Sequence, residues 1–122
     1  MKVTWRRFQR LVDALAQKVI DSGDKYEGIY GIARGGLIPA VVLSHKLKLP
    51  FITNLNSMYS KQFLVVDDIS DTGETLQRVM RTDVFKYAKT ATLHYHKQSI
   101  VEPDFWVEEK DKDWIVYPWE SE

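Results

Sequence analysis

The chain contains no cysteine, and this absence excludes two classes of structure. Without thiols it can form no disulfide bond and no thiolate metal site. The chain also lacks an excess of either charge, because 17 lysines and arginines balance 17 aspartates and glutamates. A protein dedicated to nucleic acid normally carries a basic excess, so we expect no nucleic-acid partner.

Long apolar runs are missing as well. The N-terminal MKVTWRRFQRLVDAL has no uninterrupted stretch of secretory length, and no later run could span a bilayer. We therefore expect no membrane insertion and a cytoplasmic protein. Internal repeats, low-complexity tracts and linker-like segments are absent too, while 44% of the 122 residues are hydrophobic. These features predict a single domain over residues 1–122 with a hydrophobic core.

Hydrophobic periodicity predicts helices alternating with strands. Thr4 is a suitable N-cap for a helix that runs to about Ser22 and stops at Gly23. We expect the buried face of this helix to consist of Trp5, Phe8, Val12, Leu15, Val19 and Ile20. Further helices are predicted over 37–47 and 74–87, and strands over 28–33, 63–66 and 90–96, with weaker strands at 51–55, 105–107 and 114–117. This order indicates an α/β fold, a three-layer domain with a central, mainly parallel sheet flanked by helices.

The segment FLVVDDISDTGET, residues 63–75, carries the clearest chemical signal. A buried strand would deliver Asp67 and Asp68 to its carboxyl end, where ligands bind in such sheets. Two adjacent carboxylates repel each other and lose solvation when they are buried. A sugar diol with a divalent cation nearby would compensate for this repulsion.

The next residues, 71–75, form a turn that opens a helix. Their free backbone N–H groups, the hydroxyls of Thr72 and Thr75 and the helix dipole make an anion site for one phosphate. The segment is neither a Walker A loop nor a dinucleotide fingerprint. The alternative is an acidic solvated turn in which Asp71 and Glu74 form a capping box.

A second glycine turn follows the predicted strand over 28–33. Gly35 and Gly36 permit a tight turn with exposed N–H groups, and Arg34 adds a fixed positive charge. These features suit the binding of an anion. The alternative is an ordinary turn between a strand and a helix.

The string VVDDISDTGET resembles the motif with which type I phosphoribosyltransferases bind 5-phosphoribosyl-1-pyrophosphate (PRPP). This resemblance implies that Asp67 and Asp68 hold the ribose hydroxyls, with Mg²⁺ nearby and bound to them through water. It also implies that residues 71–75 (Asp71, Thr72, Gly73, Glu74 and Thr75) hold the 5′-phosphate, with Asp71 near N7 of a purine for proton transfer. The string IARGG, residues 32–36, resembles the family's pyrophosphate loop, which often contains a non-proline cis peptide, so Arg34 and Gly35 would bind pyrophosphate.

The tail segment DWIVYPWE, residues 113–120, resembles the end of bacterial xanthine-guanine phosphoribosyltransferases. The resemblance implies that Trp114 stacks on the purine, that the Ile115 backbone meets its pyrimidine edge, and that Lys97 binds its 6-oxo group. A cation at that oxygen favours guanine, xanthine or hypoxanthine over adenine. The alternatives are a packing role for Trp114 and a solvated charge for Lys97. His94 and His96 share a strand face, but no third metal ligand is evident, so we expect a structural or surface role.

The resemblance as a whole implies a purine phosphoribosyltransferase, with a small hood built from the two termini and a homodimeric or homotetrameric assembly. One feature departs from the family pattern: the long mobile loop before the PRPP motif is reduced to residues 54–62, although Ser57 and Tyr59 echo its start. The alternative function is therefore a non-catalytic PRPP or nucleotide sensor with the same fold. A plain interaction domain would leave residues 67–75 unexplained.

Overall fold

The computed structural model describes residues 1–121, which form helices and strands in alternation. The elements are α1 (Trp5–Ser22), β1 (Ile29–Gly31), α2 (Leu37–Leu47), the 3-10 helix η1 (Leu55–Met58), β2 (Leu64–Ser70), α3 (Glu74–Met80), the 3-10 helix η2 (Asp83–Phe85), β3 (Lys89–His96) and β4 (Phe105–Lys110). Within these residues, no helix has the length and apolar character needed to cross a membrane.

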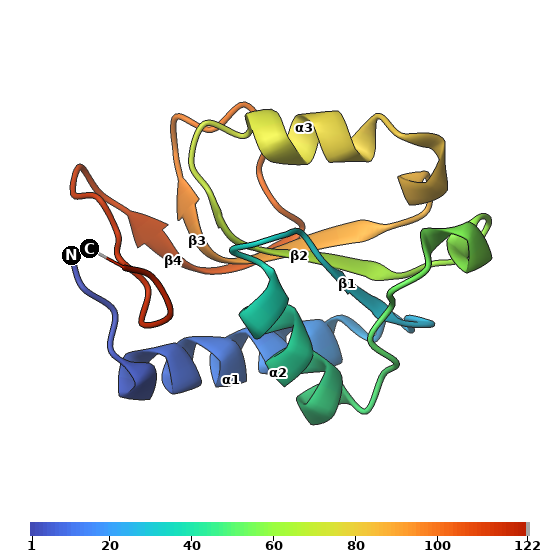
Figure 1. The fold of residues 1–122 in the computed structure, drawn as a ribbon, viewed down its shortest axis with the longest axis horizontal. Coiled ribbons are helices and arrows are strands. Elements are labelled where there is room, and N and C mark those ends of the chain that lie inside the picture. The colour runs from blue at the N-terminus through green and yellow to red at the C-terminus, as the bar shows by residue number, and fades with distance from the viewer. Residues whose placement is uncertain (122) are drawn as a thin grey trace.

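The four strands form one parallel sheet in the order β1-β2-β3-β4. Phe51 adds an isolated parallel bridge to Ile29. After α2 the chain thus pairs briefly with β1 at Phe51, and it then forms β2, which also pairs with β1. Helices α1 and α2 cover one face of the sheet and α3 covers the other (Figure 1). The predicted three-layer α/β fold is confirmed, and the carboxyl ends of β1 and β2 form the crevice where open α/β sheets bind ligands.

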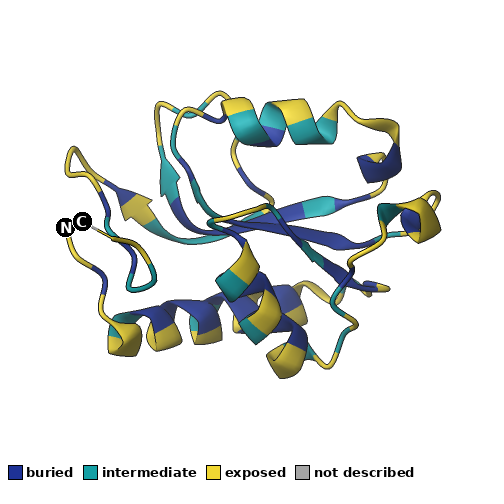
Figure 2. Cartoon of the chain, viewed as in Figure 1, coloured by how far each residue is buried: buried dark blue, intermediate teal, exposed yellow. Residues whose placement is uncertain are grey.

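Two hydrophobic cores lie on opposite faces of the sheet. Because successive strand residues point to opposite faces, Leu64 and Val66 enter the core beneath α1 and α2, whereas Phe63 and Val65 enter the core with η1 and η2. The strands therefore form the buried centre of the molecule (Figure 2). Burial on both faces makes β2 a rigid support for the residues that follow at its carboxyl end.

Helix α1 has the predicted ends but a different buried face. The Thr4 side chain accepts a hydrogen bond from the Arg7 backbone N–H, and Gly23 ends the helix in the left-handed region. The side chains of Trp5 and Ile20 are 55% and 57% exposed, so their predicted burial is wrong. The buried stripe instead consists of Phe8, Leu11, Val12, Leu15, Ala16 and Val19. Ile20 falls outside this stripe because consecutive helix residues point about 100° apart.

Three other predicted elements are shorter than expected or absent. The strand expected over 51–55 is reduced to the bridge at Phe51, because the Asn54 side chain accepts a hydrogen bond from the Asn56 backbone and turns the chain into η1. The helix expected over 74–87 ends at Met80, and extended backbone at Thr82 leads into η2. The strand expected over 114–117 is a single bridge between Val116 and Lys2.

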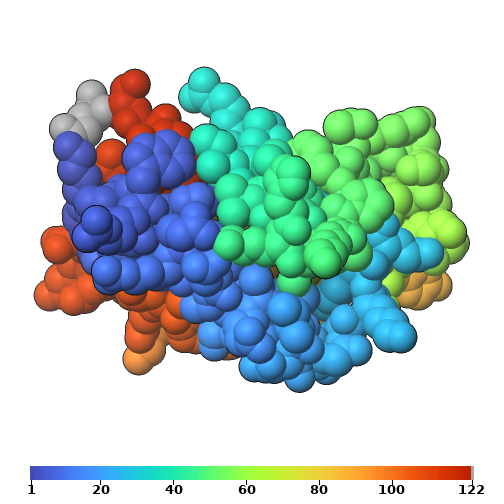
Figure 3. Space-filling view, turned by 90° about the horizontal axis from the view of Figure 1, so that it is seen from below, coloured from blue at the N-terminus to red at the C-terminus, as the bar shows by residue number. Residues whose placement is uncertain are grey.

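The two termini meet at one end of the sheet. The Val3 N–H donates to the Val116 carbonyl over 2.8 Å, and the Val116 N–H donates to the Met1 carbonyl over 2.8 Å. Figure 3 shows the N-terminal residues beside the C-terminal segment, with α1 and α2 across the visible face. The termini thus build the small structure predicted as a hood.

Candidate functional site

Three cavities meet at Asp68, near the carboxyl ends of β1 and β2. The tail cavity, of about 160 Å³, is lined by Asp68, Ile69, Asp71, Lys110, Trp114, Ile115, Tyr117 and Glu120. The loop cavity, of about 220 Å³, is lined by Asp67, Asp68, Ile69, Ser70, Asp71, Thr72, Gly73, Thr75, Leu76 and Trp114. The arginine cavity, of about 680 Å³, is lined by Arg34, Gly35, Leu37, Ile38, Asp67, Asp68, Trp119, Glu120 and Ser121. The structure thus brings together two glycine turns and the tail that lie far apart in the sequence.

The two aspartates lie within β2 and not beyond its end, because the strand runs to Ser70 and not to the predicted residue 66. Asp67 is 8% exposed. Its Oδ1 accepts a hydrogen bond from the Asp68 N–H over 2.9 Å, and Asp68 Oδ1 accepts one from the Ile69 N–H over 2.8 Å. Burial and the neighbouring Asp68 charge raise the pKa of Asp67 to about 8. Burial also raises the pKa of Asp68, although the hydrogen bonds that it accepts oppose this.

The turn after β1 packs directly on β2. The peptide bond between Ala33 and Arg34 is cis. The Ile32 N–H donates to the Val66 carbonyl over 2.9 Å, which holds the start of the turn against the strand. A Cβ atom on Gly36 would collide with the Val66 carbonyl, and one on Gly35 would collide with the Asp68 carboxylate. Glycine is therefore required for this close approach, which places Arg34 and Asp68 in the same cavity.

The turn over 71–75 does not form a capping box. Gly73 is the N-cap of α3 with φ of 87°, and no side chain caps the helix there. Asp71 instead contacts Lys110 and His96, so the capping-box alternative is wrong. The Thr72 carbonyl accepts a hydrogen bond from the Ile100 N–H over 2.8 Å, and Ser99 packs against Gly73. The turn after β3 thereby supports the loop from behind.

Asp71 joins the loop to the ends of β3 and β4. Its Oδ1 lies 3.0 Å from Lys110 Nζ and 3.1 Å from His96 Nδ1. His96 and Lys110 are register partners in the parallel strands, so both side chains leave the sheet at the same level. Sequence reasoning missed Lys110 because the predicted strand ended at residue 107. Its position at the carboxyl end of a parallel strand is the signal that could have identified it.

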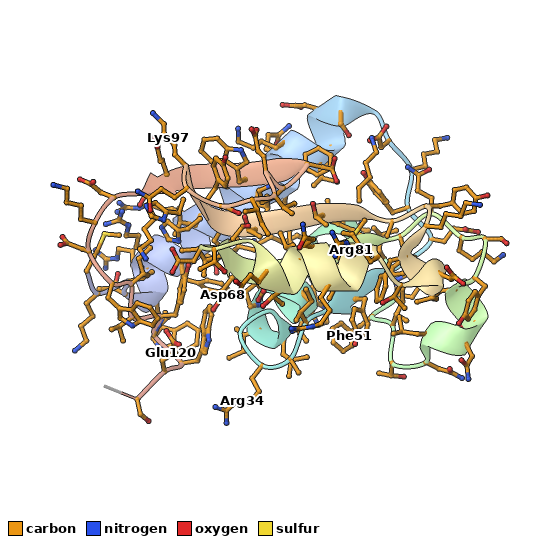
Figure 4. All side chains as sticks on the ribbon, turned by 90° about the horizontal axis from the view of Figure 1, so that it is seen from above. Arg34, Phe51, Asp68, Arg81, Lys97 and Glu120 are labelled. Atoms are coloured by element: carbon orange, nitrogen blue, oxygen red, sulfur yellow. The ribbon has the colours of Figure 1, made fainter. Side chains whose placement is uncertain are left out.

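Two of the three predicted base-binding residues line the tail cavity and the third does not. Trp114, which is 71% exposed, and Ile115, which is buried, both line the tail cavity. Lys97 lines none of the three cavities within residues 1–121; its side chain is 78% exposed and pairs with Glu109 over 3.4 Å. Figure 4 shows Lys97 pointing outward, away from the side on which Asp68, Glu120 and Arg34 lie.

His94 belongs to a buried polar network. Its Nδ1 lies 2.7 Å from the Tyr117 hydroxyl and its Nε2 lies 3.2 Å from Glu108 Oε1. Burial lowers the pKa of His94. The Tyr117 hydroxyl lies 3.2 Å from the Asp68 carbonyl oxygen, so the network connects the tail to the site. Among residues 1–121, no group of three or more His, Asp or Glu side chains is arranged to hold a metal ion.

The short segment over 54–62 lies at the end of the sheet where β2 begins, opposite the end where β2 leads into α3 (Figure 1). Met58 is buried with Phe63, Val84 and Phe85 in the second core. The Gln62 carbonyl accepts a hydrogen bond from the Glu27 N–H over 2.8 Å, near the start of β2. Met58 therefore anchors a mostly exposed segment to the second core, and no residue of 54–62 lines the arginine cavity.

Comparison with known proteins assigns the family. The model of the phosphoribosyl transferase domain matches residues 52–122, more than half of the chain. The chain belongs to the phosphoribosyl transferase family. A xanthine-guanine phosphoribosyltransferase of Nitratidesulfovibrio vulgaris Hildenborough is 31% identical to this family member over 98% of the chain and 84% of that protein.

Solved structures agree with the assignment. A purine phosphoribosyltransferase of Pyrococcus horikoshii OT3 superposes with a TM-score of 0.84 and 34% identity, over 99% of this chain and 94% of that one. A xanthine-guanine-hypoxanthine phosphoribosyltransferase of Helicobacter pylori, 19% identical, shares the fold with a TM-score of 0.82 over 98% of this chain and 92% of that one. The family expected from the two glycine turns and the tail is therefore confirmed.

Proposed function

We propose that this phosphoribosyl transferase is a pentosyltransferase of purine salvage. It moves the ribose 5-phosphate group of PRPP to a 6-oxopurine, which is xanthine, guanine or hypoxanthine, and releases pyrophosphate. The observation that carries this proposal is the meeting of three cavities at Asp68, two of which Asp67 also lines. PRPP carries a monophosphate, a diol and a diphosphate, and the second substrate is a purine base. A site for this reaction must hold all four groups close together.

Each cavity suits one part of the substrates. The loop cavity offers the 71–75 backbone and the hydroxyls of Thr72 and Thr75 to the 5′-phosphate. The arginine cavity offers Arg34 and the Gly35 backbone to the pyrophosphate. The tail cavity, with an aromatic ring and an apolar backbone segment at Trp114 and Ile115, suits a purine.

In the proposed reaction a purine nitrogen forms a bond to C1 of the ribose as the bond from C1 to the pyrophosphate oxygen breaks. Asp67 and Asp68 orient the sugar hydroxyls, and the negative charge that this pair carries favours the oxocarbenium character that develops at C1. Arg34 and the Gly35 N–H stabilise the leaving diphosphate. Asp71 lies at the boundary of the loop and tail cavities, where it can accept the proton that the base loses.

The donor set at the aspartates fits Mg²⁺ that arrives with the diphosphate. Mg²⁺ is held in such sites by one or two carboxylates together with substrate oxygens and water. Burial and the neighbouring Asp68 charge raise the pKa of Asp67, and a bound cation would relieve that repulsion. The bound ion would supply charge stabilisation for the leaving group. Asp67 and Asp68 would hold it through water, because the described residues offer no third side-chain ligand.

A specific observation favours the sensor as a second candidate function. The segment over 54–62 lies away from the site (Figure 1). It therefore does not shield a bound diphosphate from water. A protein that only binds PRPP or a nucleotide has no need of such a shield. The enzyme remains the first proposal because the tail cavity would serve a base and not PRPP alone.

The deciding experiment is a spectrophotometric assay with PRPP, Mg²⁺ and each purine base in turn. We expect turnover with at least one 6-oxopurine and a loss of about 10²-fold or more in Asp71→Asn. No turnover with any base, together with calorimetric binding of PRPP or a nucleotide, would make the protein a sensor. A cytoplasmic homodimer or homotetramer is also proposed, and light scattering of the purified protein would measure the assembly.

A further inference from the structure

The tail, residues 113–120, is joined to the sheet by the hydroxyl of Tyr117. Outside the tail, its backbone bonds go to the N-terminus: the Val116 N–H donates to the Met1 carbonyl, and the Trp114 carbonyl accepts a bond from the Met1 amino group. In the described part of the chain, the hydrogen bonds that reach from the tail to β2 and β3 are both made by this hydroxyl. It is therefore the polar link between the tail and the strands that carry the site.

The orientation of the His94 ring is fixed from behind. His94 is fully buried, its Nε2 lies 3.2 Å from Glu108 Oε1, and Glu108 also pairs with Arg7 of α1. An ionised carboxylate can only accept a hydrogen bond, so Nε2 carries the proton that faces Glu108. Because burial keeps the ring neutral by lowering its pKa, Nδ1 is left as an acceptor that faces Tyr117.

The Tyr117 hydroxyl lies between two acceptors. Its oxygen is 2.7 Å from His94 Nδ1 and 3.2 Å from the Asp68 carbonyl oxygen. Burial and the nearby aspartates raise the pKa of Tyr117, so the hydroxyl keeps its proton. One proton shared by two acceptors makes a three-centre hydrogen bond. This bond ties the tail to β3 and to β2 at the same point.

The bond joins the two parts of the site that have to meet in the reaction. Trp114 and Ile115 of the tail line the cavity that suits the purine. The residue that accepts the bond on β2 is Asp68, whose carboxylate would hold the ribose. The purine nitrogen must reach C1 of that ribose, and a displacement of about 1 Å between reacting groups can cost about 10²-fold in rate.

We propose that Tyr117 is a positioning residue, whose hydroxyl, oriented by His94, sets the distance between the purine and the ribose. This inference rests on the proposed function. The ring of Tyr117 stacks on Trp119 with 5.1 Å between the ring centres. Phenylalanine would keep this stacking, so the role of the hydroxyl can be separated from the packing of the ring.

The test is Tyr117→Phe, measured by the single-turnover rate with the preferred 6-oxopurine and by calorimetry of PRPP binding. We expect the rate to fall by about tenfold, because the tail is no longer held to β2. PRPP affinity should change by less than about twofold, since the groups proposed to bind its phosphates lie outside the tail. Tyr26→Phe is the matched control. Tyr26 is 7% exposed, donates its hydroxyl to Asp24 over 3.2 Å and, within residues 1–121, lines none of the three cavities. This variant should lose stability but keep the wild-type rate.

Two results would overturn the inference. One is a rate within about twofold of wild type in folded Tyr117→Phe, and the other is an equal fall in Tyr26→Phe, which would mark a general loss of stability. His94→Gln keeps the hydroxyl and removes the ring that orients it, so we expect a loss of about threefold in rate with unchanged PRPP affinity. A wild-type rate in His94→Gln would overturn the role given to His94. Failure of the proposed function looks different, because the wild type itself then turns over no base.

Discussion

Asp67 should destabilise the folded protein at neutral pH, so Asp67→Asn should stabilise it. The side chain is 8% exposed and lies beside Asp68, and its pKa is raised from 3.8 to about 8. A carboxyl whose pKa is raised by folding stabilises the fold only while it is protonated. Its contribution is therefore present below about pH 4 and is lost as the pH rises to about 8. Asparagine keeps an oxygen that can accept the Asp68 N–H bond but carries no charge.

The expected effect can be worked out from the pKa difference. Each unit corresponds to about 1.4 kcal/mol, which sets an upper limit of about 4 kcal/mol at pH 7. Relaxation of the site and coupling to Asp68 reduce this limit, so we expect a gain of about 2–3 kcal/mol in the free energy of unfolding. For a chain of this size the gain corresponds to roughly 10 °C in Tm.

The assay is denaturant unfolding of Asp67→Asn and wild type at pH 5, 7 and 9, with the exposed Asp113→Asn as the control. The stability difference between Asp67→Asn and wild type should grow from pH 5 to pH 9, whereas Asp113→Asn should show none. PRPP binding should be lost in Asp67→Asn despite the higher stability, because the diol would lose its carboxylate. A variant that is less stable than the wild type at pH 9 would refute the reasoning.

Alanine at the two glycines of the turn after β1 should affect different properties, folding stability at one and PRPP binding at the other. Gly36→Ala places its methyl group against the Val66 carbonyl in β2 and should lower the free energy of unfolding by about 2 kcal/mol or more in a denaturant titration. Gly35→Ala meets only the Asp68 carboxylate, so it should fold normally but bind PRPP at least about tenfold more weakly; equal effects on stability would contradict this. Because burial lowers the His94 pKa, the wild-type free energy of unfolding should fall by about 1 kcal/mol between pH 7 and pH 5.5. His94→Gln should remove this fall. An unchanged pH dependence in the variant would contradict a buried neutral His94.

Much of the fold followed from local patterns in the sequence. Thr4 and Gly23 limited α1 because a side-chain cap and a left-handed glycine act within a few residues of the helix ends. The helix over 37–47 and the strand near residue 65 were also predictable, since a continuous apolar run marks burial on both faces of a sheet. Prediction failed over 51–55, where a strand and a turn are both compatible with the sequence. The Asn54 side chain bonds to the Asn56 backbone, so the segment forms a single bridge followed by a 3-10 helix.

The sequence by itself determined the family of this protein, because the residues around Arg34, Asp67 and Trp114 each form a short motif with recognisable spacing. Only the tertiary structure decided which distant groups meet. The β3–β4 register sets His96 beside Lys110, and the end of β4 carries Lys110 to Asp71, 39 positions away in the chain. The same packing turned Lys97 outward to Glu109. No local pattern contains this information, because the register of parallel strands is fixed by the packing of both sheet faces.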